Sequence, residues 1–166
     1  MELRHRSMDF QQDREYILER HCRINYACDT PWAREKSYSD YRAEWFSLTS
    51  QISEFYGYLQ ETARDDRSIA EIIETADGRT IGYLWVPFSE DAESGFRFAE
   101  IQEIYIEEEF RRQGIAAQLY DYAEKKAKSN GAKVIRAGTG VCNSASIQLH
   151  ESLGYAPYRY EFEKLL

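Results

Sequence analysis

The sequence predicts a domain of the α/β (α+β) class, in which a mixed, mostly antiparallel sheet is flanked by helices. Three observations predict it. Two long runs with helical spacing fill the first third of the chain, three β-rich runs follow one another, and a strand–helix–strand order comes next. At 166 residues the chain has the length of one ordinary domain, so we expect residues 1–166 to fold as a single unit.

The first third of the chain is expected to form a short edge strand and two helices. Residues 2–7 are predicted as the strand and residues 9–24 as the first helix, because apolar side chains recur there at helical spacing. The segment 28–32 interrupts this pattern. A second long helix is predicted to begin near Ser39 and Asp40, which are good capping residues. Its core-facing side chains are Tyr41, Trp45, Leu48, Ile52, Phe55 and Leu59.

The middle of the chain predicts an antiparallel meander. Residues 68–75 and 80–88 are β-rich runs joined by residues 76–79, and the Asp-Gly pair in this connection is a strong hairpin signal. Residues 90–95 read as a polar loop. Residues 96–106 are then expected to return as a third strand.

A crossover unit is predicted next. A helix beginning at Gly114 places apolar side chains on one face, and Asn130-Gly131 supplies a stop signal. Residues 132–139 are expected as a strand. Because a strand–helix–strand connection joins parallel strands with right-handed geometry, residues 99–106 and 132–139 should be parallel neighbours.

Two further elements complete the expected fold. Asn143 is a suitable N-cap for a last helix, which Gly154 would end. Residues 159–165 are predicted as a final strand.

Composition excludes several classes of protein. The formal net charge of -8 disfavours nucleic acid as a partner, since phosphate binding requires clustered Lys and Arg. No apolar run approaches membrane-spanning length and the first residues lack a secretion signal, so we expect no membrane partner and a cytoplasmic location.

The cysteines agree with a reducing compartment. Cys22, Cys28 and Cys142 are an odd number without a Cys-x-x-Cys pair, which argues against a disulfide framework. His21 with Cys22 and Cys28 lacks a fourth ligand at a standard spacing, so no metal site is expected.

The most informative segment is Arg111-Arg112-Gln113-Gly114-Ile115-Ala116, which lies between a β-type run and a helical run. Small residues at such a junction let backbone N–H groups face an anion, and the first turn of the helix adds partial positive charge. The segment therefore predicts a site for a diphosphate. Alone it also fits an ordinary turn, and it gains weight from a second landmark at residues 143–155.

The order and spacing of these two segments resemble the GNAT superfamily of acyltransferases. Its loop reads Gln/Arg-x-x-Gly-x-Gly/Ala, and its later segment reads Asn-x-x-Ala-x-x-Leu-Tyr-x-x-x-Gly-Phe/Tyr. The matching residues are Arg111, Gly114 and Ala116, followed by Asn143, Ser146, Leu149, Gly154 and Tyr155. The resemblance covers roughly residues 68–165 and departs from the pattern at His150, where the family usually has tyrosine.

The resemblance implies a GNAT fold, with about six or seven strands, about four helices and a splayed parallel strand pair that binds acyl-CoA. It implies acetyl-CoA as co-substrate. The diphosphate would rest on backbone amides before the helix, and the pantetheine arm would hydrogen-bond to the preceding strand. The expected cofactor-binding residues are Ile104, Tyr105, Ile106, Arg111, Arg112, Gln113, Gly114, Ile115, Ala116, Asn143 and Ser146.

Acetyl transfer to an amine requires a proton acceptor, because an alkylammonium with a pKa of about 10.4 is charged at neutral pH. Glu103 and Glu100 are the candidates. Glu100 aligns, counting back from Arg111, with the base of histone-lysine acetyltransferases of this superfamily. Glu103 shares a face with Ile101 and Tyr105 if the strand is regular, whereas a bulge would exchange the faces. We favour Glu103 slightly, and leave open that either residue only binds the ammonium.

The departing thiolate calls for a proton donor. His150 stands at the tyrosine position, but an ordinary imidazole pKa of about 6.5 leaves it mostly neutral at pH 7. A neutral imidazole N–H can still hydrogen-bond to sulfur. A histidine without a role fits the sequence equally well, and Tyr155, Tyr158 or water would then supply the proton.

The leading hypothesis is an acetyl-CoA-dependent N-acetyltransferase acting on a primary amine of a small molecule. The segment expected near the acceptor is rich in aromatic residues, which suit a cationic amine: Tyr26, Trp32, Tyr38, Tyr41 and Trp45. A protein lysine acetyltransferase and a non-catalytic acyl-CoA-binding sensor remain as alternatives. A homodimer is a reasonable expectation because the chain has thirteen tyrosines and an exposed edge strand.

Overall fold

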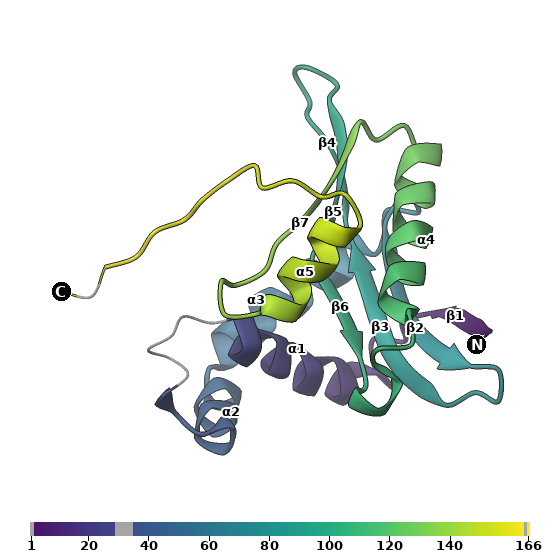
Figure 1. Ribbon diagram of the computed structural model, residues 1–166. Coiled ribbons are helices and arrows are strands. Elements are labelled where there is room, and N and C mark those ends of the chain that lie inside the picture. Colours follow the sequence, from purple (N-terminus) through teal and green to yellow (C-terminus); the bar gives the residue numbers. More distant parts are fainter. Residues whose placement is uncertain (1, 29–34, 165) are drawn as a thin grey trace.

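The computed structural model describes residues 2–28, 35–164 and 166. They form two sheets covered by helices (Figure 1). The strands are β1 (Leu3–Ser7), β2 (Ile69–Thr75), β3 (Thr80–Val86), β4 (Phe88–Glu90), β5 (Arg97–Ile101), β6 (Glu103–Ile106) and β7 (Val134–Ala137). The helices are α1 (Arg14–Cys28), α2 (Tyr38–Ser47), α3 (Thr49–Thr62), α4 (Ile115–Ser129) and α5 (Ser144–Ser152), with a 3-10 turn, η2, at Glu108–Phe110.

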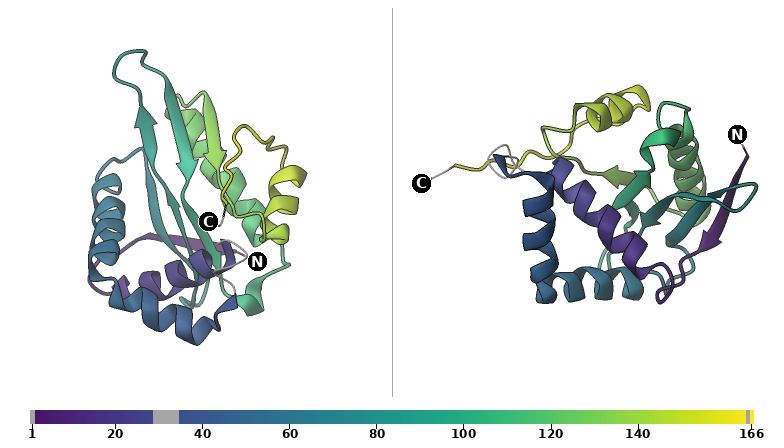
Figure 2. Two further views of the ribbon diagram at one scale, coloured as in Figure 1. Left: turned by 90° about the vertical axis from the view of Figure 1, so that its left-hand side faces the viewer. Right: turned by 90° about the horizontal axis from the view of Figure 1, so that it is seen from below.

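The sheets are layered between two groups of helices (Figure 2). One sheet has the order β1-β2-β3-β6 and the other the order β4-β5-β7. Alternate side chains of a strand point to opposite faces, so Leu84 packs with α4 whereas Tyr83 packs with α1 and α3. The α4 layer therefore covers one face and the α1–α3 layer the other.

The central hairpin forms as predicted. β2 and β3 pair antiparallel, and Gly78 in their connection has a φ of +85°, a conformation that favours glycine. Gly82 serves a different purpose. A Cβ built on it would lie 2.1 Å from the carbonyl oxygen of Tyr105, so only glycine lets β3 approach β6 this closely.

Two predictions about the first helices need correction. The first helix begins at Arg14 rather than residue 9, because the Asp9 carboxylate accepts hydrogen bonds from the N–H groups of Gln11 and Gln12 and holds a turn there. The predicted second helix is two helices. The chain leaves helical geometry at Leu48, whose ψ is 68°, and the cap that precedes α2 is Ser37.

The predicted third strand is also divided, and the division changes which side chains share a face. β5 pairs with β4 and β7, β6 pairs with β3, and Gln102 lies between them. Ile101 and Ile104 consequently both pack in the α4 layer, while Glu103 lies on the opposite face. The strand is therefore not regular, and the alternative in which an extra residue exchanges the faces is the one present, with Glu103 on the face opposite Ile101.

The predicted parallel pair is present over part of its length. β5 and β7 run parallel, with Phe98 opposite Val134 and Ile101 opposite Ala137. β6, which continues from β5, pairs with β3 and not with β7. The two neighbouring strands thus diverge beyond Ile101, and the divergence creates an opening beside β6.

The predicted last strand is wrong. The described residues of the segment 159–165 are 159–164, and they contain no strand. After Tyr155 the chain leaves the body of the molecule (Figure 1), with Tyr160 75% and Phe162 93% exposed. The alternation of apolar and polar residues is present, but the segment is not paired with a strand of its own chain.

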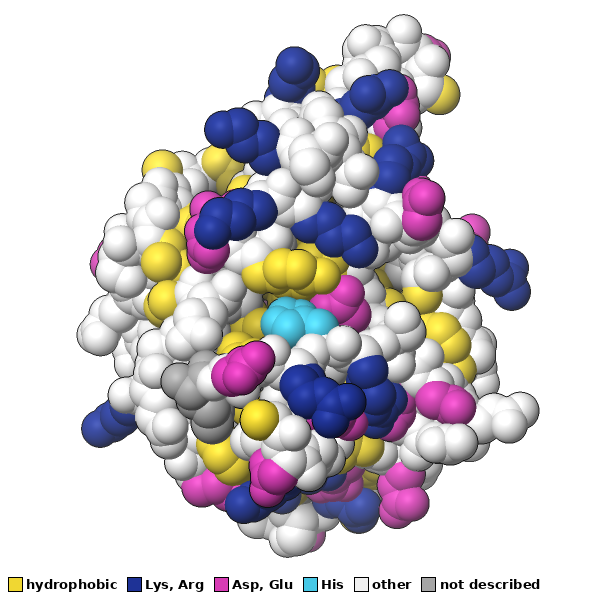
Figure 3. Space-filling view, turned by 90° about the vertical axis from the view of Figure 1, so that its right-hand side faces the viewer, with side chains coloured by type: hydrophobic (Ala, Val, Ile, Leu, Met, Phe, Trp, Pro, Cys, Tyr) yellow, Lys and Arg dark blue, Asp and Glu magenta, His cyan; other side chains and the backbone are white. Residues whose placement is uncertain are grey.

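The surface over α4 and β1 carries mixed charge. In Figure 3, Asp and Glu side chains lie among the Lys and Arg side chains of this face. Lys125 on α4 pairs with Asp121 at 2.6 Å, and Arg67 pairs with Asp65 at 2.8 Å and Glu90 at 3.0 Å. Carboxylates thus neutralise these basic residues. Among the helices of the described residues, none is long and apolar enough to cross a lipid bilayer.

Candidate active site

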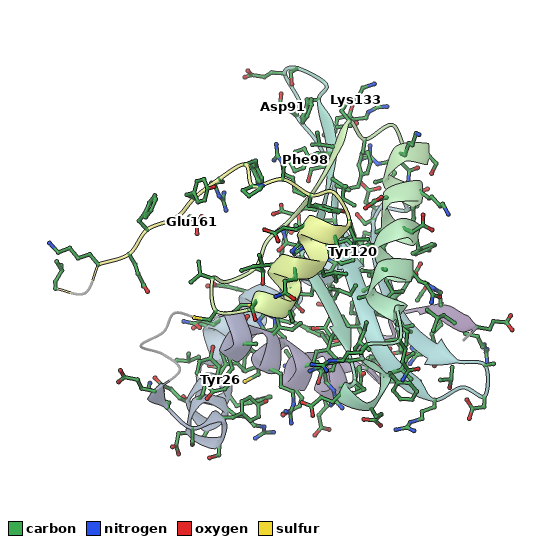
Figure 4. All side chains as sticks on the ribbon, in the orientation of Figure 1. Tyr26, Asp91, Phe98, Tyr120, Lys133 and Glu161 are labelled. Carbon is green, nitrogen blue, oxygen red and sulfur yellow. The ribbon has the colours of Figure 1, made fainter. Side chains whose placement is uncertain are left out.

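A cleft of about 590 Å³ opens where β6 diverges from β7. One wall consists of α4 and α5, the other is α1 with the start of α2, and β6 forms the floor. Tyr120 on the α4 side and Tyr26 on the α1 side both line the cleft and are labelled in Figure 4. The cleft therefore has two differently built halves.

The α4 half begins with the glycine-containing loop. Gly114 has a φ of +76° and precedes the first residue of α4, and Arg112 has a φ of +59°. The N–H groups in the first turn of a helix have no partner within the helix, so those of α4 are available to an anion. The Arg111 side chain is fixed by a hydrogen bond of 2.8 Å from Nε to the carbonyl of Ile106.

Most of the expected cofactor-binding residues reach this cleft. Those that line it are Ile104, Tyr105, Ile106, Arg111, Ala116, Asn143 and Ser146. The other four do not line it: Arg112, Gln113, Gly114 and Ile115. The Ile115 side chain is buried in the core, and the Gln113 amide donates to the carbonyl of Glu109, so these two residues shape the loop.

The second sequence landmark closes one end of the cleft. The Asn143 side chain accepts a hydrogen bond from the N–H of Ser146 and caps α5, as predicted. Its amide nitrogen also lies 3.7 Å from Sγ of Cys28 at the end of α1. A Cβ on Gly140 would lie 1.8 Å from the Cys28 carbonyl oxygen, so a glycine is needed where this loop meets α1.

The α1 half contains a buried carboxylate. Glu103 is 7% exposed and lines the cleft. One oxygen of its carboxylate is bonded to Nδ1 of His21, and the other accepts a hydrogen bond of 2.5 Å from the Tyr83 hydroxyl. Burial, reinforced by the Glu103 charge, raises the pKa of Tyr83 well above its usual value of 10.0, so this hydroxyl remains a donor.

A second layer of contacts orients His21. The Asn25 amide nitrogen lies 3.0 Å from Nε2 of His21, and the imidazole stacks on Phe55 with a centroid distance of 3.5 Å. An amide N–H₂ can only donate, so Nε2 accepts and Nδ1 carries the hydrogen that is donated to Glu103. This network joins residues 82 positions apart, and no local sequence pattern indicates it.

The two candidate bases are thereby separated in space. Glu103 lines the cleft and Glu100 does not. Ala99 and Ile101 pack in the α4 layer, so Glu100 between them points to the other face, where its charge acts on Tyr58 of α3. The interruption at Gln102 has thus placed both glutamates on the same face of the sheet, but only Glu103 at the opening.

Tyr120 occupies the cleft where His150 was expected to act. His150 does not line the cleft, and its Nε2 lies 2.7 Å from the Tyr120 hydroxyl. Burial lowers the pKa of His150 below its ordinary value of 6.5, so its imidazole is neutral at pH 7. Burial also raises the pKa of Tyr120, which keeps its phenol protonated. The sequence does contain a signal for Tyr120 at the cleft. Tyr120 lies one helical turn after Ala116, so the two residues share a face of the helix.

The remaining tyrosines considered as donors lie elsewhere. The Tyr155 hydroxyl donates to Glu124 at 3.0 Å, and Tyr158 is 60% exposed beside Arg136. Neither lines the cleft.

The aromatic residues expected near an acceptor take different positions. Tyr26 and Tyr38 line the cleft, and the Tyr26 ring contacts both Tyr38 and Tyr41. Trp45 is 7% exposed and belongs to the core. Trp32 lies outside the described residues.

A helix N-terminus, a diverging parallel strand pair and a buried carboxylate around one cleft define the class of acyl-CoA-dependent acyltransferases. A model of the acetyltransferase (GNAT) family matches residues 25–155. The chain belongs to this family, as the sequence motifs predicted.

Similar proteins agree with this assignment. An L-methionine sulfoximine/L-methionine sulfone acetyltransferase of Pseudomonas aeruginosa is 31% identical over 117 residues, which are 68% of this chain and 64% of that protein. The chain spans about half to two thirds of the length of the curated relatives it matches.

Two solved structures share the fold. A putative acetyl transferase from Pyrococcus furiosus has a TM-score of 0.67 at 22% identity and covers 99% of this chain and 100% of its own. AAC(6')-Iy, solved with a bisubstrate analogue of CoA and acetylneamine, has a TM-score of 0.58 at 18% identity, covering 100% of this chain and 99% of its own. These likenesses support the predicted fold class.

Proposed function

We propose that this protein is an acetyl-CoA-dependent N-acetyltransferase that acts on a primary amine of a small molecule. One observation carries the proposal. The buried carboxylate of Glu103, held by His21 and Tyr83, opens into the same cleft as the first turn of α4. This supports a proton acceptor on the floor of the cleft and an anion-binding helix terminus on one of its walls.

Acetyl-CoA would enter the α4 half. Its diphosphate fits the free N–H groups that follow Gly114, with Arg111 as counter-charge. The pantetheine arm fits the edge of β6 that faces away from β3, where backbone groups are free to pair as with an added strand. The carbonyl of Ile106 already accepts from Arg111, so the pairing would be made by the preceding residues.

The amine would approach from the α1 half. Glu103 removes one proton from the substrate ammonium, and the neutral nitrogen attacks the thioester carbonyl. The C–S bond then breaks. The nitrogen loses its second proton, which passes to the departing thiolate, so that coenzyme A leaves as the free thiol. His21 and Tyr83 already donate to both oxygens of Glu103, which fixes the position of the carboxylate at the cleft.

Tyr120 takes the role that the sequence assigned to His150. The Tyr120 hydroxyl lies 2.7 Å from Nε2 of His150, and in the tautomer with its hydrogen on Nδ1 the imidazole accepts from this hydroxyl. Rotation of that hydroxyl about its C–O bond redirects the hydrogen to the departing sulfur. A phenol with a raised pKa assists here by hydrogen bonding, and His150 acts only by orienting it.

Thiol release from acetyl-CoA tests the proposal against its two alternatives. We expect release with small amines from a panel of amino acids, polyamines and aminoglycosides. Release with lysine peptides alone would instead support a protein lysine acetyltransferase. Tight acetyl-CoA binding without release for any acceptor would indicate the non-catalytic sensor.

We propose in addition that the chain is cytoplasmic and forms a homodimer. Its three cysteines are free in the structure, which suits a reducing compartment.

Two features support the homodimer. The apolar side chains of the C-terminal segment 156–164 are exposed, and among the described strands β7 is paired on one side only. We expect light scattering to give a dimer for the full chain and a monomer after removal of residues 158–166. A monomeric full chain would contradict this.

A further inference from the structure

The α1 half of the cleft contains a cation that makes no side-chain hydrogen bond within residues 2–28 and 35–164. Arg23 on α1 lines the cleft beside Tyr26 and Tyr38. Its guanidinium lies over the Tyr38 ring, 4.7 Å from the centroid, and the nearest carboxylate oxygen among the described residues is that of Glu19, 3.8 Å from Nε. That distance is too long for a hydrogen bond.

Glu19 is committed to other partners. Its Oε2 accepts from Nε of Arg42 at 2.7 Å, and its Oε1 accepts from the Tyr38 hydroxyl at 3.0 Å. By comparison, Arg20, one helical turn earlier on α1, makes two hydrogen bonds of 2.7 and 2.9 Å to Glu107. Arg23 is therefore the arginine of this helix that stands in the cleft with its N–H fork unsatisfied within the described chain.

The position of Arg23 relates it to the proposed base. Its positive charge acts on Tyr105, which lies two residues after Glu103 on the same face of β6 and also has the Arg111 guanidinium 5.5 Å from its ring centroid. The cation thus lies on the α1 wall of the cleft, beside Tyr26 and Tyr38, and the carboxylate lies on the adjoining floor formed by β6. The first turn of α4 lies on the opposite wall, so its N–H groups would hold the diphosphate apart from the acceptor.

We propose that the acceptor carries a carboxylate close to its amine, as an amino acid does, and that Arg23 binds this carboxylate. This inference rests on the proposed acetyltransferase function. The ammonium would face Glu103 while both carboxylate oxygens pair with the planar guanidinium fork. The cation–π contact with Tyr38 holds the guanidinium at the cleft wall, and a planar guanidinium pairs with a carboxylate through two N–H groups.

The test compares each L-amino acid with its own carboxamide as acceptor, in the wild type and in Arg23→Gln. We expect the wild type to prefer the acid, and Arg23→Gln to lose roughly 10- to 100-fold in kcat/KM for the acid, mainly through KM. The carboxamide should change less than about twofold. Arg23→Lys keeps the charge without the fork and should fall between the two.

Arg14→Gln provides a matched control, because Arg14 lies at the start of the same helix and does not line the cleft. It should leave both acceptors unchanged. Equal turnover of acids and carboxamides, unaltered in Arg23→Gln, would overturn the inference while acetyl transfer stands. If acetyl-CoA binds and no acceptor of either kind releases thiol, the proposed function itself fails and the inference falls with it.

Discussion

The two halves of the cleft present different chemical groups, backbone groups in the α4 half and side chains in the α1 half. The α4 half relies on backbone groups supplied by two short continuous segments, residues 111–116 and 143–155. The α1 half relies on side chains from separate elements, with His21 on α1, Tyr83 on β3 and Glu103 on β6. A backbone site needs small residues at fixed spacing, so a sequence motif can predict it. A network of side chains from distant elements depends on the tertiary fold, so no sequence motif predicts it.

The largest effect is expected from the α1 half. Glu103→Gln removes the proposed proton acceptor and should lower kcat/KM by about 10²- to 10⁴-fold in the thiol-release assay. The dissociation constant for acetyl-CoA should not change, because the proposed cofactor contacts on β6 are made by backbone groups, which this substitution leaves in place.

Glu100→Gln is the matched control for this change. It removes the same charge three residues earlier on the same face, outside the cleft. We expect less than a twofold effect on turnover. A loss at Glu100 as large as that at Glu103 would show that the base is misassigned.

The next effect tests the α4 half. Gly114→Ala forces a side chain onto a residue with φ of +76° and should weaken acetyl-CoA binding about tenfold, measured by calorimetry. Gly78→Ala imposes comparable strain at φ of +85° in the β2–β3 turn, remote from the cleft. If both variants lose the same affinity, the effect is general destabilisation and not the anion site.

A smaller effect on kcat is expected for Tyr120, on the α4 side of the cleft. Tyr120→Phe removes the hydroxyl at the cleft wall and should lower kcat about fivefold with unchanged acetyl-CoA affinity. His150→Gln, which keeps a polar partner for Tyr120, should reduce kcat by less. The reverse order would restore His150 as the group that contacts the departing sulfur.

The smallest effect concerns stability. Because burial depresses the pKa of His150 below 6.5, the unfolded chain binds more protons than the folded chain just below that pH. The contribution of His150 to stability is present above pH 6.5 and is lost as the pH falls through the depressed value. The Tm of the wild type should therefore drop further between pH 7.5 and 5.5 than that of His150→Gln. Parallel profiles would contradict this.

The fold was largely predictable where local signals are strong. The Asp-Gly hairpin, the crossover through α4 and the Asn143 cap all formed as expected. The break at Leu48 was not predicted, because it depends on how the flanking helices pack and leucine is not a helix breaker. An interruption of the strand near Gln102 was considered as a possible bulge, but the sequence could not show that it occurs. The final strand failed for a related reason, since alternation supplies a strand pattern but not a pairing partner.

The site was likewise predictable only where short sequence motifs define it. Arg111, Ala116, Asn143 and Ser146 were predicted from motifs and line the cleft. His21, Tyr83 and Tyr120 were missed as functional residues, because their contacts join elements that are far apart in the chain. The sequence favoured Glu103 over Glu100 only slightly, and the fold adds that Glu103 lines the cleft whereas Glu100 does not.

Calorimetric titration of the wild-type protein with acetyl-CoA tests the central claim most directly, because the cofactor half is the part on which every proposed step depends. We predict saturable binding at one site per chain, weakened in Gly114→Ala and intact in Glu103→Gln. An absence of binding heat at millimolar acetyl-CoA, with the protein folded, would contradict the cofactor site and the acetyl transfer built on it.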